Sequence, residues 1–144
     1  MAKTAINVGR QTVLSAVRTF NYEDFTVDGS GNATINAIHL KPGTRILRGW
    51  LDVTTAWDSG TTATLSVGDT LADDVDKYLT ATTSKAAGIT ELDGTPVADG
   101  EISTAEAVTV TLAETGTAAT AGEATLFVEY VESPRCTEFH TYRG

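Results

Sequence analysis

The strongest constraint on the fold of this chain is an alternation of small β-branched and polar residues that recurs along its length. The clearest runs are Ala63–Val67, Ala107–Leu112 and Glu123–Val131. Successive side chains of a β-strand point to opposite faces, so each run has one buried face and one solvated face. Glycine and aspartate separate the runs, as they do in turns between strands. The pattern predicts an all-β protein made of antiparallel strands.

The length and composition fit one domain with a substantial core. The chain has 144 residues, of which 41% are hydrophobic. Turn signals at roughly 8–12-residue spacing predict about seven or eight strands, which favours a jelly roll or a related antiparallel β-sandwich. We expect an extended N-terminal arm over residues 1–19, a sandwich domain over residues 20–132 and a C-terminal tail over residues 133–144. A short amphipathic helix over Thr12–Arg18 is an alternative within the arm.

The turn signals also predict the order of the elements. We expect two hairpins, one made by Ile46–Trp57 with Thr62–Val67 and the other by Ala107–Leu112 with Ala124–Val131. The remaining expected elements are strands at Phe20–Val27 and Ala33–Leu40, turns at Asp28–Asn32 and Lys41–Thr44, a solvated acidic loop at Gly68–Asp76, and a mobile small-residue tip at Thr115–Gly122.

The charge of the chain is acidic and unevenly distributed. The formal net charge is −9. Residues 1–48 hold six basic and three acidic side chains, whereas residues 49–134 hold two basic and fifteen acidic ones. An acidic protein has few cations to displace counterions from phosphates, so we expect neither nucleic acid nor an anionic membrane as a partner. The uneven distribution reflects either chance and solubility or a basic side that docks on an acidic partner.

Few residues have the chemistry of a catalytic or metal site. The single cysteine, Cys136, excludes an intrachain disulfide. Cys136 and His140 are four residues apart, but His39 is the only other histidine, which is too few ligands for a typical zinc site. Residues 69–76 lack the acid spacing and central glycine of the 12-residue calcium loop, so calcium binding there stays open. A Gly-x-Ser-x-Gly motif is absent. We predict no enzyme activity, no cofactor and no metal.

The start of the chain carries no recognisable secretory signal. Residues 1–7 lack an apolar stretch, and no run approaches the ~18 apolar residues of a membrane span. We therefore expect synthesis and folding in the cytoplasm.

Two tryptophans point to a surface rather than to a catalytic site. Trp50 and Trp57 fall on opposite faces of one expected strand. If one face is the core, the other tryptophan is exposed for a partner, or is covered by a loop or by the N-terminal arm. Arg45 and Arg48 lie shortly before Trp50 in the sequence and are natural interface partners if Trp50 is exposed. The predicted interface residues are Arg10, Arg18, Arg45, Arg48 and Trp50.

The order of strands and turns in this chain resembles a known family. The matching segments are Gly49–Val53, the Trp57–Gly60 turn, Ala63–Asp69, Asp76–Leu79, Val108–Val110 and Gly122–Tyr130. Together they resemble small virion proteins of tailed bacteriophages, in particular the capsid decoration, or cement, proteins of the jelly-roll type. The resemblance covers roughly residues 45–131, and it rests on strand and turn chemistry rather than on a catalytic signature.

The resemblance implies a structural function. Proteins of that family bind the outside of the capsid after its expansion and bridge neighbouring major capsid proteins, often as dimers or trimers. The expected partners are therefore the major capsid protein and further copies of this chain, and the expected location is the outer capsid surface of the virion. The family has no catalytic residues to carry over. The alternatives are a tail or fibre-associated phage protein, a glycan-binding sandwich, and a small hydrolase that depends on His39 or on a carboxylate.

Overall fold

The computed structural model describes residues 12–70, 74–93 and 106–132. Within these ranges the chain forms eight β-strands and one short 3-10 helix, as expected of an all-β protein. The elements are β1 (Leu14–Asn21), η1 (Tyr22–Asp24), β2 (Asn32–Leu40), β3 (Thr44–Thr55), β4 (Thr62–Asp69), β5 (Asp74–Thr83), β6 (Gly88–Glu91), β7 (Glu106–Thr115) and β8 (Glu123–Glu132). The described part of the chain contains no helix with the length and apolar character needed to cross a membrane.

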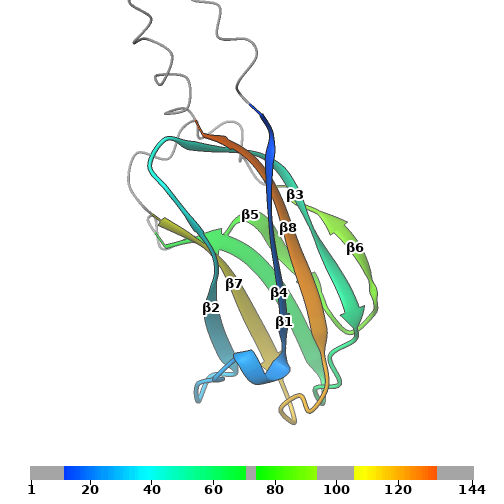
Figure 1. The fold of residues 1–144 in the computed structure, drawn as a ribbon. Helices are drawn as coiled ribbons and strands as arrows, with labels where there is room; N and C mark the ends of the chain where they lie inside the picture. The colour runs from blue at the N-terminus through cyan, green and yellow to red at the C-terminus, as the bar shows by residue number, and fades with distance from the viewer. Residues whose placement is uncertain (1–11, 71–73, 94–105, 133–144) are drawn as a thin grey trace, which may run out of the picture.

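The strands form two antiparallel sheets that pack face to face (Figure 1). The first sheet has the order β1-β8-β3-β6 and the second has the order β2-β7-β4-β5. Strands from the two halves of the chain pair in a nested way, because β1 pairs with β8, β2 with β7, β3 with β6 and β4 with β5. A long hairpin rolled up on itself gives this arrangement, which is that of a jelly roll. The predicted fold class is confirmed.

Both expected hairpins are wrong. Strands β3 and β4 lie in different sheets, and so do β7 and β8. The segments between them cross from one sheet to the other instead of turning back within a sheet. Alternation in a sequence specifies which face of a strand is buried, but it does not specify which strand lies beside it. Only β4 and β5 are consecutive strands of one sheet within the described ranges.

The first strand begins earlier than expected. Strand β1 pairs with β8 from Leu14 to Asn21, so the expected arm of residues 1–19 overlaps a strand of the sandwich, and the alternative helix at Thr12–Arg18 does not form. The expected strand at Phe20–Val27 is wrong, because η1 follows directly after β1. Asn21 starts η1 as a capping box: its side chain accepts a bond from the Glu23 N–H at 2.9 Å, and Asp24 accepts one from the Asn21 N–H at 2.8 Å. Residues 1–11 and the expected tail, residues 133–144, lie outside the described ranges.

The core lies between the two sheets. Its centre is formed by Leu51, Leu65 and Leu126, which are fully buried and come from β3, β4 and β8. An irregularity in the β3–β8 register lies between Ile46 and Arg48, and this shift explains why Ile46 is buried in the core while the intervening leucine is only partly covered. Alternation is then regular from Gly49 to Val53, and a second shift in the β3–β8 register lies between Val53 and Thr55.

The crossing segments at one end of the sandwich are bonded to one another. Trp57 follows β3, is 1% exposed, and donates its backbone N–H to the Ser84 carbonyl at 2.9 Å. Asp58 accepts bonds from the backbone N–H and the hydroxyl of Thr120, both at 2.7 Å, and from the Ala121 N–H at 2.9 Å. These bonds lower the pKa of Asp58 to about 2, and the bond from the Thr120 hydroxyl has the largest effect. The segment expected as a mobile tip is therefore tied to the segment that follows β3.

Gly122 provides a test of this packing. A Cβ atom there would overlap the indole ring of Trp57, and the residue has a φ of +153°, which L side chains rarely adopt. We expect Gly122→Ala to lower the free energy of unfolding by about 1–3 kcal/mol. Gly29→Ala is the control, because a Cβ at Gly29 meets nothing within 4 Å, and we expect a change below about 0.5 kcal/mol. Urea denaturation of the two variants checks this, and equal stabilities would contradict it.

The bonds to Asp58 predict a pH dependence. The folded-state pKa of about 2 lies below the ordinary value of 3.8, so the ionised carboxylate stabilises the folded state above pH 3.8, and this stabilisation disappears as the pH falls through about 2. We expect Asp58→Asn to be less stable than wild type at neutral pH, and the difference to shrink between about pH 4 and pH 2. Thermal unfolding across this range measures it, and a difference that does not change with pH would refute the assignment.

Candidate interaction surface

The outer face of the first sheet carries a row of apolar side chains. Val17 of β1 lies opposite Phe127 of β8, and Phe127 lies opposite Trp50 of β3. These side chains point outward because their strand neighbours, such as Leu51, point into the core. Ile89 of β6 pairs with the position two residues beyond Trp50 and is its diagonal neighbour. We call Val17, Phe127, Trp50 and Ile89 the apolar row.

The apolar row is held together by an aromatic contact, and the described residues leave part of it exposed. The rings of Trp50 and Phe127 stack with centroids 5.4 Å apart and planes 19° apart, a contact worth about 0.5–1.5 kcal/mol beyond the area it buries. Both aromatic side chains are half-buried, whereas Val17 is 55% and Ile89 is 70% exposed. Neighbouring exposed apolar side chains of this kind are typical of surfaces that bind another molecule.

Charges of both signs border the apolar row. Arg48 donates to Glu129 from Nε at 2.6 Å and from Nη2 at 3.4 Å, and its Cζ lies 5.9 Å from the Trp50 ring centroid. The hydrogen bond to Glu129 raises the pKa of Arg48. Glu91 lies opposite Trp50, and Asp52 lies opposite Ile89. The surface is therefore an apolar stripe between acidic and basic side chains rather than a basic patch.

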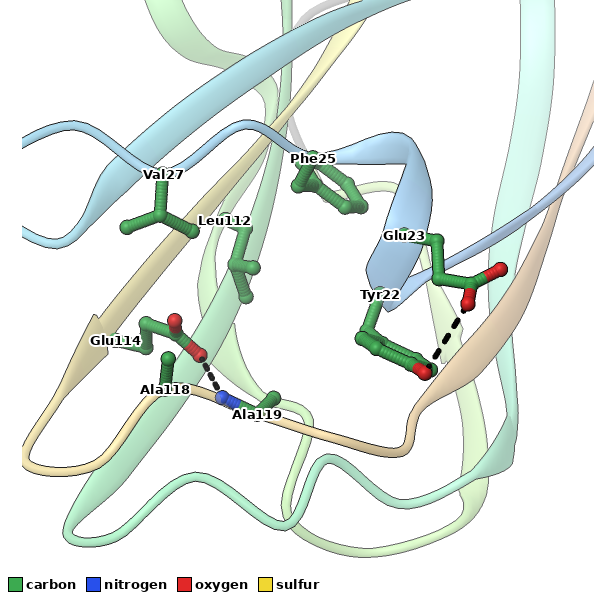
Figure 2. Close-up of a pocket in the computed structure, with 8 residues that line it drawn as sticks. All are labelled: Tyr22, Glu23, Phe25, Val27, Leu112, Glu114, Ala118 and Ala119. Carbon is green, nitrogen blue, oxygen red and sulfur yellow. Dashed lines mark hydrogen bonds between the residues drawn. The ribbon is translucent and has the colours of Figure 1, made fainter.

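A cavity of about 300 Å³ lies at the end of the sandwich that contains η1 (Figure 2). Its lining combines apolar side chains with two carboxylates and consists of Tyr22, Glu23, Phe25, Val27, Leu112, Glu114, Ala118 and Ala119. The Ala119 N–H donates to Glu114 Oε2 at 3.2 Å, and the Tyr22 hydroxyl donates to Glu23 Oε1 at 3.2 Å. The negative charge of Glu23 raises the pKa of Tyr22.

Comparison with known proteins identifies the fold. No protein-family model and no curated protein matches this sequence. Solved structures of phage capsids contain chains of similar fold. A chain in the capsid of Ralstonia phage GP4 has 17% identity and a TM-score of 0.59, with 89% of this chain and 94% of that chain covered. A chain in the capsid asymmetric unit of cyanophage Pam1 has 18% identity and a TM-score of 0.61, with 85% and 86% covered.

A third structure gives the same result. A chain in the acidic stable capsid of Helicobacter pylori bacteriophage KHP30 has 14% identity and a TM-score of 0.55, with 84% of this chain and 92% of that chain covered. At these identities the likeness shows a shared fold. The covered share of each chain also indicates that the similarity extends over nearly the whole sandwich.

The structure brings together only some of the predicted interface residues. Arg45, Arg48 and Trp50 lie on the outer face of the first sheet, at or beside the apolar row. Arg18 pairs with the buried Leu126 of β8, so it lies on the core side of β1. It is nevertheless exposed, because β1 is at the edge of the sheet. Arg10 lies outside the described residues. The described basic residues of the N-terminal third are thus not gathered on one side of the molecule.

Three residues of the apolar row were missed by the sequence interpretation. Phe127 has a usable signal, because it is out of phase with the buried positions Ala124, Leu126 and Val128 of the same strand. Its contact with Trp50 could not be read from the sequence, because the two residues meet only through the β3–β8 register. Val17 lies in the segment expected as an arm, and Ile89 lies outside every expected strand. Of the two tryptophans, Trp57 is buried and Trp50 is partly exposed, but Trp57 follows the end of β3 at Thr55 instead of lying on the opposite face of the same strand.

The expected acidic loop is largely part of two strands. Asp69 ends β4, is 3% exposed and forms an ion pair with Lys77, while Asp74 begins β5. Asp69 is therefore a buried strand residue with a cationic partner, and not part of a solvated loop. Across residues 12–70, 74–93 and 106–132, no three or more His, Cys, Asp or Glu side chains are grouped to hold a metal. His39 is exposed on β2, and Cys136 and His140 lie outside the described residues.

The different positions of the two tryptophans can be tested by fluorescence. Trp57→Phe leaves Trp50 as the single emitter, and Trp50→Phe leaves Trp57. We expect the emission of Trp57→Phe to be the more red-shifted and the more strongly quenched by acrylamide of the two, because Trp50 is partly exposed on the outer face. The emission of Trp50→Phe should be blue-shifted and weakly quenched, because Trp57 is 1% exposed. Equal quenching of the two variants would disprove the assignment of the outer face.

Proposed function

We propose that this chain is a structural virion protein of a tailed bacteriophage, which binds the outer surface of the capsid and bridges neighbouring major capsid proteins. The observation that carries the proposal is the similarity in fold to chains from three phage capsids, which extends over 84–89% of this chain. The strand and turn pattern from Gly49 to Tyr130 supports the same family. The role is structural and requires no catalytic group.

The apolar row is the contact surface in this proposal. Val17, Trp50, Phe127 and Ile89 would be buried against a capsid protein, and each square ångström of apolar area removed from water contributes about 25 cal/mol. Trp and Arg are frequent at the energetic centres of interfaces. Arg45 and Arg48 border the row, and Arg48 is already oriented by its bonds to Glu129. We expect association driven by apolar burial, with only a modest dependence on salt.

Multiple copies would make such contacts effective on a shell. A capsid repeats each contact site by symmetry, and a dimer or trimer of this chain could contact several capsid proteins at once. After the first contact, the second occurs at a high effective concentration because the two are linked. Contacts that are individually weak would therefore hold neighbouring capsid proteins together.

Binding to stripped shells tests the proposed function. Capsids of the phage that encodes this chain are freed of small accessory proteins, mixed with the purified chain and sedimented. We expect saturation at on the order of hundreds of copies per shell, because closed shells repeat their sites by symmetry, and shells that resist heat better after binding. Absence of binding refutes the proposal, and binding of only a few copies per particle assigns the protein to the tail.

Charge substitutions test the contact surface. Val17→Asp and Ile89→Asp together place carboxylates in the apolar row, and we expect them to weaken capsid binding at least about tenfold, which corresponds to about 1.4 kcal/mol. Val75→Asp is the matched control, because Val75 is also an exposed large apolar residue but belongs to β5 of the second sheet. If the control weakens binding as much as the double variant, the contact surface lies elsewhere.

A further inference from the structure

The cavity beside η1 has three walls that come from different parts of the chain. The segment from Tyr22 to Val27 forms one wall, the end of β7 with Leu112 and Glu114 forms the second, and Ala118 and Ala119 form the third (Figure 2). The crossing bonds of Asp58 to Thr120 and Ala121 fix the segment that contains the third wall. The cavity is therefore held in shape by the fold itself.

Glu114 is the unusual residue of this cavity. It is 7% exposed and lies on the core side of β7, on the same face as the buried Leu112 two residues earlier. Its backbone is held toward the edge strand β2, because its N–H donates to the carbonyl of Gly31, just before β2, at 2.8 Å. Across the sheet it lies opposite Ala63, a small residue. The sheet thus places a carboxylate on the same face of β7 as the buried apolar residues Val108, Val110 and Leu112.

The carboxylate of Glu114 is only partly satisfied. Oε2 accepts the bond from the Ala119 N–H, but among residues 12–70, 74–93 and 106–132 no side chain or backbone group donates to Oε1, and no cation forms an ion pair with Glu114. Oε1 is not one of the described buried side-chain atoms that lack a hydrogen-bond partner, so it is open to the solvent that fills the cavity. A cationic group that enters the cavity would replace this solvent with a charge-assisted hydrogen bond.

We propose that this cavity binds a primary ammonium group carried on a short apolar stem. The ammonium would donate to Glu114 Oε1, and the stem would pack against Phe25, Val27 and Leu112. The cavity volume of about 300 Å³ is at the small end of ligand pockets. The proposal is independent of the capsid role, because the cavity is not part of the apolar row.

The charge and geometry of the cavity favour an ammonium over other ligands. Glu114 and Glu23 lie on opposite sides of the cavity in Figure 2, and together with the net charge of −9 they disfavour anions. A guanidinium binds best to both oxygens of a carboxylate, but Oε2 of Glu114 is already bonded to Ala119. An ammonium is a compact charge with three donors, and it can use the remaining oxygen alone.

Butylamine is the probe for a direct test on the full chain. Backbone amide spectra by NMR are recorded during titration with butylamine and, separately, with 1-butanol, a neutral compound of the same shape. We expect saturable shifts of the Ala118 and Ala119 amides with butylamine and at least tenfold weaker binding of 1-butanol. Equal binding of the two compounds overturns the proposal. This comparison uses the wild-type chain alone, so it does not depend on the folding of a variant.

Two matched variants assign the binding to one carboxylate. Glu114→Gln keeps an acceptor for the Ala119 N–H but removes the charge, and we expect at least a tenfold loss of butylamine affinity. Glu23→Gln removes the carboxylate on the opposite side, and we expect less than a threefold loss. Butylamine binding to Glu114→Gln at the wild-type affinity overturns the proposal.

Two further amines distinguish the sources of the ammonium group. Binding of N-acetyl-lysine amide as tightly as butylamine supports a lysine side chain of a protein as the natural ligand. Tighter binding of 1,4-diaminobutane than of the lysine derivative supports a free diamine. Failure of both to bind, despite their ammonium groups and apolar stems, overturns the proposal. None of these outcomes depends on capsid binding, so the proposed function is tested separately.

Discussion

The sandwich depends on the packing of Trp57 beneath the segments that cross between its two sheets. A nested strand order requires almost every connection to change sheets, and such connections would leave the end of the core open to water. Trp57 closes that end as a fully buried side chain, and Gly122 lets the chain pass directly over its ring. Asp58, the next residue, bonds the two crossing segments to each other. The cavity beside η1 exists in a defined shape only because these segments are fixed.

The two outer faces of the sandwich differ in character. The first sheet presents the stacked rings of Trp50 and Phe127, whereas the second presents hydroxyl groups. On the second sheet Thr34 pairs with Thr111 through their Oγ1 atoms at 2.9 Å, and Thr62 pairs with Thr115 at 2.7 Å. Hydroxyls that bond to one another across strands satisfy much of their hydrogen-bonding capacity within the sheet. The first sheet has such a pair too, Thr19 with Thr125 at 2.9 Å, so the two faces differ mainly in the stacked rings of the apolar row.

The sequence was sufficient for the fold class but not for the strand order. The alternation in Ala63–Val67 and Glu123–Val131 identifies strands and their buried faces, because it reflects the pleat of each strand alone. Pairing depends on contacts between residues far apart in the chain, such as Arg48 with Glu129, and no local pattern encodes them. The same limit applies to the apolar row. Trp50 could be recognised as a surface candidate, but its neighbours Phe127 and Ile89 are set by the register of three strands.

The position of β8 has a consequence for how the protein is made. This strand is the last one described along the chain, yet it lies inside its sheet, between β1 and β3. The first sheet therefore cannot assemble on the ribosome until nearly all of the described chain has been synthesised. Until then β1 and β3 have open edges at which other strands can pair. Contacts between such distant segments also make folding slow. A cell that synthesises many copies of this protein at once must therefore keep incomplete chains from aggregating until the last strand of each has been made.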